Sequence, residues 1–426
     1  MKPDAETLET NEEADASVAG DAIGDTVYSE RFVLKILLKL ANLDSLKDEV
    51  KDKSFEDDLC TLWDMTADKD VVLFLQKHDV LNLFNFALPT IETPRIIEII
   101  VGIIGNMCCQ RIAVAKLIKM ENFLRLLLEY IKTDDSLVLI QLLRLVSSAL
   151  FLAECEDIPI WMNLFESVGY SEALYFILKN SSHKQLLITA IENTNSVCSY
   201  CNTDNVRTTF YARFVNVEAV VSLTTAFTEV VVNQKESCEK EELERVLLIS
   251  LQITLNMVGF ENASEKFHSC KDSVLSMIKH ILLYYEDKLI NQKEIDTDLV
   301  DIVDSTITIV NLLQLSESSA IDVFFVPCHN MWKAMSVATK SHQNGNSDFE
   351  DSNEDLAQIS KEIKLPLCNL LCGYVLKCSE THLLTALDVI NGDYEIIVCE
   401  VDSEIRNNVS RRATNYRTRL KEIIDS

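Results

Sequence analysis

The hydrophobic positions of this chain recur at helical spacing and form two kinds of segment. In residues 27–40 and 123–131 the apolar residues occupy a single helix face. In residues 94–109 and 137–152 they cover nearly the whole circumference. The first pattern predicts an amphipathic helix, and the second predicts a helix that is buried between neighbours. Because no run of β-branched alternation is long enough to require a sheet, we expect an all-α protein.

The segment 94–109, which reads PRIIEIIVGIIGNMCC, is the clearest of the buried helices. Pro94 can open it, because the N–H that proline lacks would be unpaired in the first turn. Gly102 and Gly105 each cost about 1 kcal/mol of helix stability relative to alanine. We therefore expect the backbone of a neighbouring segment to approach closely there. Asn106 places an amide near the helix end, where it could bind a ligand or cap a turn.

An amphipathic helix, a polar turn and an all-apolar helix follow one another more than once. The first two intervals between the ends of the apolar runs, 41 and 46 residues, match armadillo and HEAT repeats of about 40–47 residues. The later intervals of 55 to 63 residues require charged insertions. These features predict an armadillo/HEAT-like α-solenoid. The small polar residues that mark the run ends are Asn106, Ser147, Asn193, Asn256, Asn311 and Asn369.

Polar segments flank and interrupt the expected helical repeat domain, which spans residues 26–404. Residues 1–25 carry eight acidic side chains and one lysine, which predicts a disordered acidic tail. Residues 45–58 are interpreted as a charged linker, and residues 341–360 as a disordered acidic insertion. Residues 405–426 form a basic C-terminal segment.

The overall charge is strongly negative, with 67 acidic against 39 basic residues and a net charge of −28. Such a surface repels nucleic acid phosphates and anionic membranes, so neither is an expected partner. It would attract basic peptide segments of other proteins, although solubility alone also explains the charge. The thirteen cysteines, without a signal peptide, indicate a reducing compartment. The sequence contains no run of 18 apolar residues, so no membrane span is predicted.

Candidate catalytic and metal sites are weak. Cys198 and Cys201 have the spacing of a zinc or redox half-site but lack a second pair of ligands. Cys368 and Cys372 are spaced i and i+4, Cys378 lies further on, and His382 follows it by four residues, so a metal site can be imagined there, but a clearer fourth partner is lacking. No motif of a hydrolase, a phosphate-binding loop or a metalloprotease occurs. We therefore predict no catalytic residue, no cofactor and no metal site.

Partner binding is the expected role of the helix ends. In solenoids of this type the third helix of each repeat lines a concave surface, where asparagine can hydrogen-bond an extended peptide backbone. The alternative is that each asparagine caps a helix and each tryptophan, including Trp161 and Trp332, fills the core. The candidate partner-binding residues are Asn106, Arg95, Trp63, Asn193, Asn256 and Asn311.

The basic segment at the C-terminus stands out on so acidic a chain. It can be a solvated helix face, a nuclear import signal, or a tail that folds back onto the solenoid and inhibits it. Arg411 and Arg412 precede Thr414 in the pattern of a basophilic kinase site. Phosphate on Thr414 would offset part of the local positive charge.

Several short blocks resemble the serum amyloid A-like (SAAL) family, in the same order and at similar spacing. The resemblance covers residues 20–110 well, 111–200 loosely, and little beyond. It implies an armadillo-like all-α fold, a largely nuclear protein and an association with cell proliferation; it implies no catalytic residue. Because the C-terminal half departs from the pattern, partner specificity is not carried over. The blocks are Ile23 to Ser29 (IGDTVYS), Trp63-Asp64-Met65, Asp70-Val71 with Leu73 to Gln76 (LFLQ), and Pro94-Arg95 through Gly102-Ile103 to Gly105-Asn106-Met107.

The expected function is therefore a non-enzymatic scaffold that binds proteins through a concave solenoid surface inside the cell. The expected compartment is the nucleus, with the cytoplasm as the alternative. One rival is an importin-like transport adaptor for basic cargo, whose binding would weaken steeply with salt and respond to a transport regulator. A less favoured rival is a Cys-dependent enzyme, which would need a closed pocket with perturbed cysteine or histidine residues.

Overall fold

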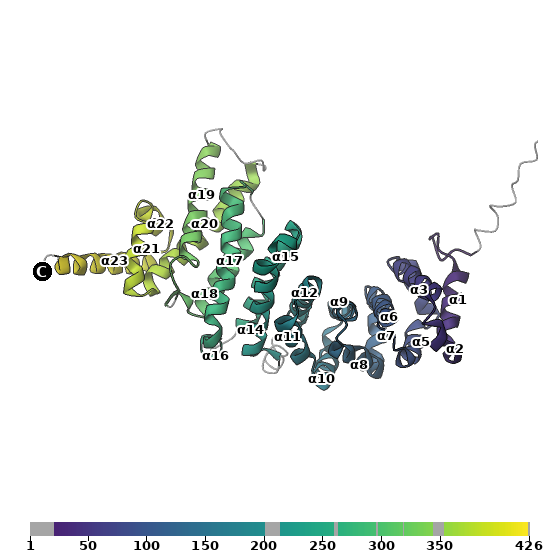
Figure 1. The fold of residues 1–426 in the computed structure, drawn as a ribbon. Coiled ribbons are helices and arrows are strands. Elements are labelled where there is room, and N and C mark those ends of the chain that lie inside the picture. Colours follow the sequence, from purple (N-terminus) through teal and green to yellow (C-terminus); the bar gives the residue numbers. More distant parts are fainter. Residues whose placement is uncertain are drawn as a thin grey trace, which may run out of the picture. The chain divides into compact units, whose positions relative to one another are not determined.

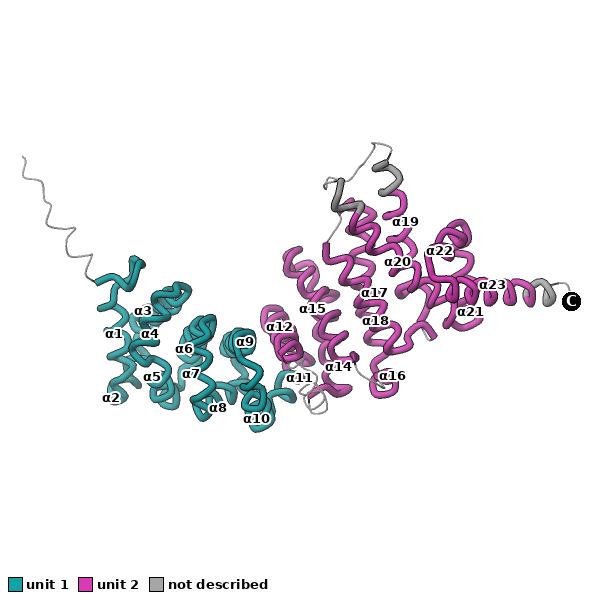
Figure 2. The backbone as a smooth tube through the Cα atoms, turned by 180° about the vertical axis from the view of Figure 1, so that it is seen from behind, with its two compact units in different colours: residues 1–174 teal, residues 175–426 magenta. Residues whose placement is uncertain are grey.

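The computed structural model describes residues 21–200, 214–259, 263–294, 297–317, 319–343 and 353–424. Every regular element within these residues is helical, and one isolated bridge joins Ala22 and Ser29. The all-α class is thus confirmed. The chain forms two compact units, residues 1–174 and 175–426, where the sequence predicted one helical domain over 26–404 (Figure 1, Figure 2). The division falls within α11 (Tyr170–Asn180).

The first unit is a series of short helices in which successive buried helices pack on one another. Within it α3 packs on α6 and α6 on α9, while α1 contacts α5 and α8 contacts α10 (Figure 2). The helices are α1 (Glu30–Ala41), α2 (Leu43–Glu49), α3 (Lys53–Met65), α4 (Lys69–Lys77), α5 (Val80–Ala87), α6 (Pro94–Met107), α7 (Arg111–Lys119), α8 (Glu121–Glu129), α9 (Ser136–Leu152) and α10 (Ile158–Val168), with the 3₁₀ turns η1 (Leu88–Thr90), η2 (Tyr130–Lys132) and η3 (Cys155–Asp157).

The central helix α6 begins and packs as its sequence predicts. Pro94 occupies the first helical turn, and Thr93 precedes it in an extended conformation. Every residue from Ile96 to Gly105 is buried, which follows from apolar residues on all sides of the helix. The next buried helix, α9, is capped by Asp135, whose carboxylate accepts hydrogen bonds from the N–H groups of Leu137 and Val138.

The charged stretch 45–58 is not a linker, contrary to the sequence-based prediction. It forms most of α2 and the first half of α3. Leu46 and Phe55 are completely buried, and Asp52 caps α3 by accepting a hydrogen bond from the N–H of Ser54. The many charges here lie on the solvent face of amphipathic helices, so counting charges alone misses the two buried anchors.

The second unit continues the same mode of packing with longer helices. The helices α12, α15, α18, α20 and α23 contact one another in that order, and α14, α17 and α19 form a second series (Figure 1). The elements are α12 (Lys184–Tyr200), α14 (Val217–Phe227), the π-helical turn η4 (Thr228–Asn233), η5 (Lys235–Ser237), α15 (Lys240–Val258), α16 (Ala263–Lys266), η6 (His268–Cys270), α17 (Lys271–Ile290), α18 (Leu299–Leu312), η7 (Leu315–Glu317), α19 (Phe325–Gln343), α20 (Asn353–Lys377), α21 (Glu380–Val389), α22 (Tyr394–Glu400) and α23 (Ser403–Ile424).

The predicted polar segments differ in extent from the structure. Of the acidic tail, residues 1–20 lie outside the described part, whereas residues 21–25 form a turn in which Ile23 is buried. Of the insertion 341–360, residues 344–352 lie outside the described part, and residues 353–360 belong to α20, where Ile359 and Ser360 are buried. The basic segment up to Ile424 belongs to α23, which packs on α20 rather than standing apart.

No single described helix is long and apolar enough to cross a membrane. The pair α6 and α7 meets those criteria of length and composition only together, across a bend of 119°.

Replacing Gly102 with alanine is expected to lower the free energy of unfolding by about 1–3 kcal/mol, the usual penalty for overpacking. A Cβ at this position would lie 2.3 Å from Cε2 of Trp63. At Gly105 the nearest atom would lie 3.6 Å away, so alanine fits there. That variant is expected to be as stable as the wild type or up to about 1 kcal/mol more stable. Denaturant unfolding, combined with hydrogen exchange of the α6 amides, measures both changes.

A smaller ring at position 63 provides the control. In the Gly102→Ala background, Trp63→Phe should recover part of the lost stability, since the two side chains compete for the same space. Equal stability of the two glycine variants would contradict the tight contact between α3 and α6.

Candidate functional site

The sequence blocks that resemble the SAAL family contact one another in the first unit. The turn before α1 contains Gly24, whose φ of +56° lies in the left-handed region that favours glycine. The N–H of Asp25 donates a hydrogen bond to Oδ2 of Asp70, at 3.1 Å. A Cβ on Gly24 would lie 2.3 Å from that carboxylate oxygen. The first block is therefore held directly against the start of α4.

The second contact joins α3 to α6. The ring of Trp63 lies against Gly102, so the missing side chain of the glycine makes room for the indole. One turn later, Nδ2 of Asn106 donates to Oγ1 of Thr66 at 3.0 Å and to the carbonyl of Trp63 at 3.5 Å. The amide therefore hydrogen-bonds to the end of α3 inside the unit. The sequence had suggested instead that this amide binds a partner.

Arg95 is the centre of a charged cluster between α3 and α6. Its Nη1 lies 2.7 Å from Oε2 of the buried Glu98, and its Nη2 donates to Sγ of Cys60 at 3.4 Å. Nε of Arg95 lies 3.5 Å from Glu56, whose pKa is lowered chiefly by a hydrogen bond from Lys53 and further by Arg95. The guanidinium is partly exposed, so a partner can reach it, whereas Glu98 is buried.

The remaining residues predicted to bind partners have different environments. Asn193 in α12 is completely buried and Asn256 in α15 is 8% exposed, so a partner has no open access to their amides. Asn311, near the end of α18, is exposed. Trp161 and Trp332 are buried in the core, which confirms the alternative interpretation of these two rings. The asparagine spacing marks the packing interface of the helices better than it marks a binding surface.

The cysteines proposed as half-sites are buried thiols in the part of the chain that the structure describes. Burial raises the pKa of Cys198, Cys368 and Cys372 to about 12. Cys201 lies outside the described residues. Among the described residues, no group of three or more histidine, cysteine, aspartate or glutamate side chains is arranged to hold a metal ion.

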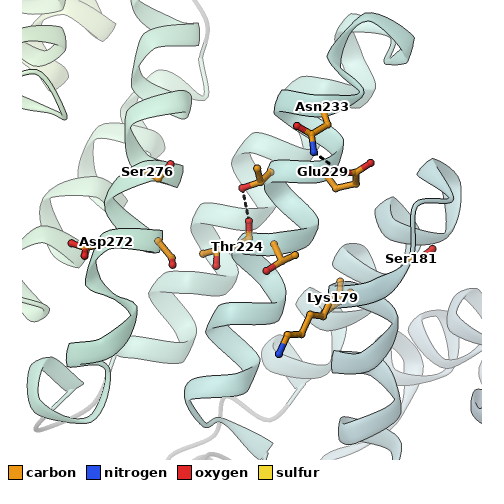
Figure 3. Close-up of a pocket in the computed structure, with 11 residues that line it drawn as sticks. Lys179, Ser181, Thr224, Glu229, Asn233, Asp272 and Ser276 are labelled. Atoms are coloured by element: carbon orange, nitrogen blue, oxygen red, sulfur yellow. Dashed lines mark hydrogen bonds between the residues drawn. The ribbon is translucent and has the colours of Figure 1, made fainter.

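A polar groove lies in the second unit between α11, the junction of α14 with η4, and the first turns of α17 (Figure 3). Its volume is about 500 Å³. Hydroxyl, carboxylate, amide and ammonium groups converge on it from three elements, whereas a core-facing surface would be apolar. The polar lining residues are Lys179, Ser181, Thr224, Thr225, Thr228, Glu229, Asn233, Asp272, Ser273 and Ser276.

Hydrogen-bond acceptors predominate in this groove. The hydroxyl groups of Thr225 and Thr228 donate to carbonyls four residues earlier in their helix, which leaves their oxygens able to accept. The carboxylate of Glu229 accepts from Nδ2 of Asn233 and from Nε2 of Gln234, and these bonds lower its pKa. The groove is therefore suited to a ligand that supplies N–H donors.

This groove was not predicted from the sequence, because its residues come from three separate segments. One local signal was available in residues 224–233 (TTAFTEVVVN), where Thr224, Thr225 and Thr228 interrupt an apolar helix and Glu229 and Asn233 follow one turn apart. This stretch ends in the π-helical turn η4, and such turns are frequent at functional sites.

The basic C-terminal segment is attached to the second unit by its arginines. Arg406 donates to the carbonyls of Val398, Cys399 and Val401, and Arg412 donates to the carbonyl of Cys378. The carbonyl-bound guanidinium groups explain why a strongly basic helix folds onto the unit. Arg411 and Thr414 are exposed, so the basophilic kinase pattern lies on the solvent side of α23.

Exposure predicts which thiols react with an alkylating reagent. At pH 7.5 a thiol of pKa about 12, such as Cys368 or Cys372, is ionised in fewer than about one molecule in ten thousand. Because the raised pKa keeps the thiol protonated, raising the pH to 9 should still leave both unmodified. The exposed Cys109, Cys155 and Cys399 should react with iodoacetamide at least about 100-fold faster. Peptide mass spectrometry after a short pulse measures the rates, with a urea-unfolded sample as the control. Labelling of Cys368 in the folded protein at the rate of Cys155 would contradict the described burial.

Comparison of the sequence with known proteins tests the resemblance to the SAAL family. No family model matches the chain. It is 31% identical to the protein SAAL1 of Homo sapiens over 181 residues, which is 40% of this chain and 38% of that protein. It is 30% identical to the protein saal1 of Danio rerio over 186 residues, or 42% of this chain and 39% of that protein. For SAAL1 of Mus musculus the values are 30% over 198 residues, 44% and 41%.

The chain therefore spans about two fifths of the length of the curated relatives it matches. Among solved structures, an engineered protein aligns with 90% of this chain and 93% of its own, at 12% identity and a TM-score of 0.43, which is too low to bear on the fold. The resemblance predicted from the N-terminal blocks is confirmed: over about 40% of its length, this chain is a homologue of the SAAL1 proteins, the serum amyloid A-like family.

Proposed function

We propose that this protein is a non-enzymatic scaffold that binds other proteins along an armadillo/HEAT-like α-solenoid. The proposal is supported by the serial packing of helices in each unit, since stacked helical repeats leave extended surfaces for partners. The family resemblance adds the expectation that the protein acts in the nucleus and promotes cell proliferation. We extend the proposal to that compartment and process on the resemblance alone.

The observation that carries the proposal is the acceptor-rich groove of the second unit. An extended peptide presents a regular row of backbone N–H groups, which carboxylate and hydroxyl oxygens can bind without reading the side chains. Glu229 and Asp272 add two carboxylates to the hydroxyl oxygens of the lining. The ligand class that fits this lining is an extended, lysine- or arginine-containing peptide, in agreement with the net charge of −28.

The buried cysteines favour binding over catalysis. A nucleophilic cysteine acts as the thiolate and needs a lowered pKa together with access to substrate. Cys368 and Cys372 have the opposite properties, and Cys328 next to His329 is buried with a raised pKa as well. His329 lies 3.1 Å from the carboxylate of Asp393, and its own pKa is lowered mainly by burial.

The test is to place a bulky cation in the groove without disturbing the core. Thr225 is exposed on α14, and Thr225→Arg should repel a basic peptide and cover the acceptors. Mass spectrometry identifies the proteins that the wild-type chain captures from a nuclear extract. The amount of each captured protein should be at least about tenfold lower with this variant, which corresponds to about 1.4 kcal/mol of binding free energy.

The matched control is Thr308→Arg on α18. Thr308 is also an exposed helical threonine, and its hydroxyl donates to the carbonyl of Asp304 as that of Thr225 does to Val221. Circular dichroism of both variants verifies the fold. An unchanged set of captured proteins, or an equal loss with both variants, would show that the groove is not the binding surface.

A further inference from the structure

A second groove lies at the start of the first unit, along α1 and α2. Its volume is about 480 Å³. Basic and apolar side chains make up most of its lining, and Leu38 in it is 71% exposed. The residues that matter for its chemistry are Arg31, Leu34, Lys35, Leu38 and Lys39 from α1, with Glu49 from α2.

The basic residues of this groove form a stripe on one face of α1. Arg31, Lys35 and Lys39 are spaced four residues apart, which places them one above another on the helix. Lys39 is already paired with Glu49 at 2.7 Å and lies over the ring of Phe55. The side chain of Arg31 is 89% exposed, Lys35 is exposed, and no ion pair involves Lys35 within the described residues.

The described chain begins at the edge of this groove. Asp21 accepts hydrogen bonds from Oγ of Ser29 and from the N–H of Arg31, and its Oδ1 lies 3.6 Å from Nε of Arg31. Because Asp21 lies beside the basic stripe, this is the point at which the preceding residues 1–20 are joined to the unit. They carry six carboxylates and one lysine, with Met1, Leu8 and Val18 as their larger apolar residues.

The length of the segment suffices for it to reach along the stripe. The twelve-residue α1 is about 18 Å long, and twenty residues extend to as much as about 70 Å. Because the segment is tethered, its effective concentration at the groove is in the millimolar range, so even weak exposed ion pairs can hold it.

We propose that the acidic segment 1–20 of this chain docks in the groove of α1 and α2, with its carboxylates on Arg31 and Lys35. Docking covers the exposed Leu38 and completes the end of the helical stack, which in a repeat protein needs a polar cap. Since the contact rests on screened surface charges, it opens with salt, and an acidic segment of a partner can displace it. The proposal is independent of the polar groove in the second unit.

The test is carbodiimide cross-linking of the full chain, which joins a carboxylate and an amine in contact as an amide. We expect peptides in which the amine of Lys35 is joined to a carboxylate within residues 4–15, and about fivefold less of this product in 1 M salt, where the Debye length falls to about 3 Å. Mixing unlabelled and isotope-labelled chains distinguishes links within one chain from links between two.

Charge reversal sharpens the test. Arg31→Glu with Lys35→Glu removes the reacting amine and reverses the charge of the stripe, so that adding Glu9→Lys, Glu12→Lys and Glu13→Lys should produce links in the reverse sense, from lysines of the segment to glutamates of α1. Lys77→Glu, at an exposed position in α4 of the same unit, is the matched control and should leave the link unchanged. Absence of the Lys35 link in the wild type, links only between different chains, or no restoration by the swapped charges would each overturn the proposal.

Discussion

The packing of α6 against its two neighbours is the constraint on which the first unit depends. Gly102 lets the indole of Trp63 lie against the helix, whereas at Gly105 even an added Cβ would lie 3.6 Å from the backbone of Leu145 in α9, an ordinary van der Waals distance. Both glycines carry the helix-propensity cost noted above, and the buried apolar surface of α6 offsets it. Because α6 contacts both α3 and α9, it links the successive buried helices of the unit.

Polar groups then fix the register of this stack. Asn106 ties the end of α6 to Thr66, and Asp70 accepts from the turn at Gly24. Glu98 is buried in the middle of α6 and is paired with Arg95, since an unpaired carboxylate would be costly in that position. The sequence blocks that resemble the SAAL family thus largely supply the contacts that hold these helices together. The family resemblance in this region therefore concerns residues that determine helix packing.

The sequence predicted the helical class and the buried helices well, because hydrophobic periodicity is a local property. Pro94 and the apolar circumference of α6 located the start of this helix and its core positions correctly. The prediction from sequence failed where a few buried residues determine the structure, as with Leu46 and Phe55 in the predicted linker. The grooves could not be predicted from periodicity, since their residues come from separate helices and meet only after packing. For the same reason Asn193 looked like a ligand group and is a core residue.

The attachment of α23 has a consequence for how the protein can change during evolution. Arg406 and Arg412 bind four main-chain carbonyls, and a carbonyl is offered by whatever residue occupies the position. Substitutions at Val398, Cys399 or Val401 therefore leave these acceptors in place, although burial still constrains two of these side chains. Loss of either arginine removes its contacts at once. Within the limits that burial sets, the side chains at these carbonyl positions can therefore change without loss of the acceptors, whereas the two guanidinium groups cannot be replaced.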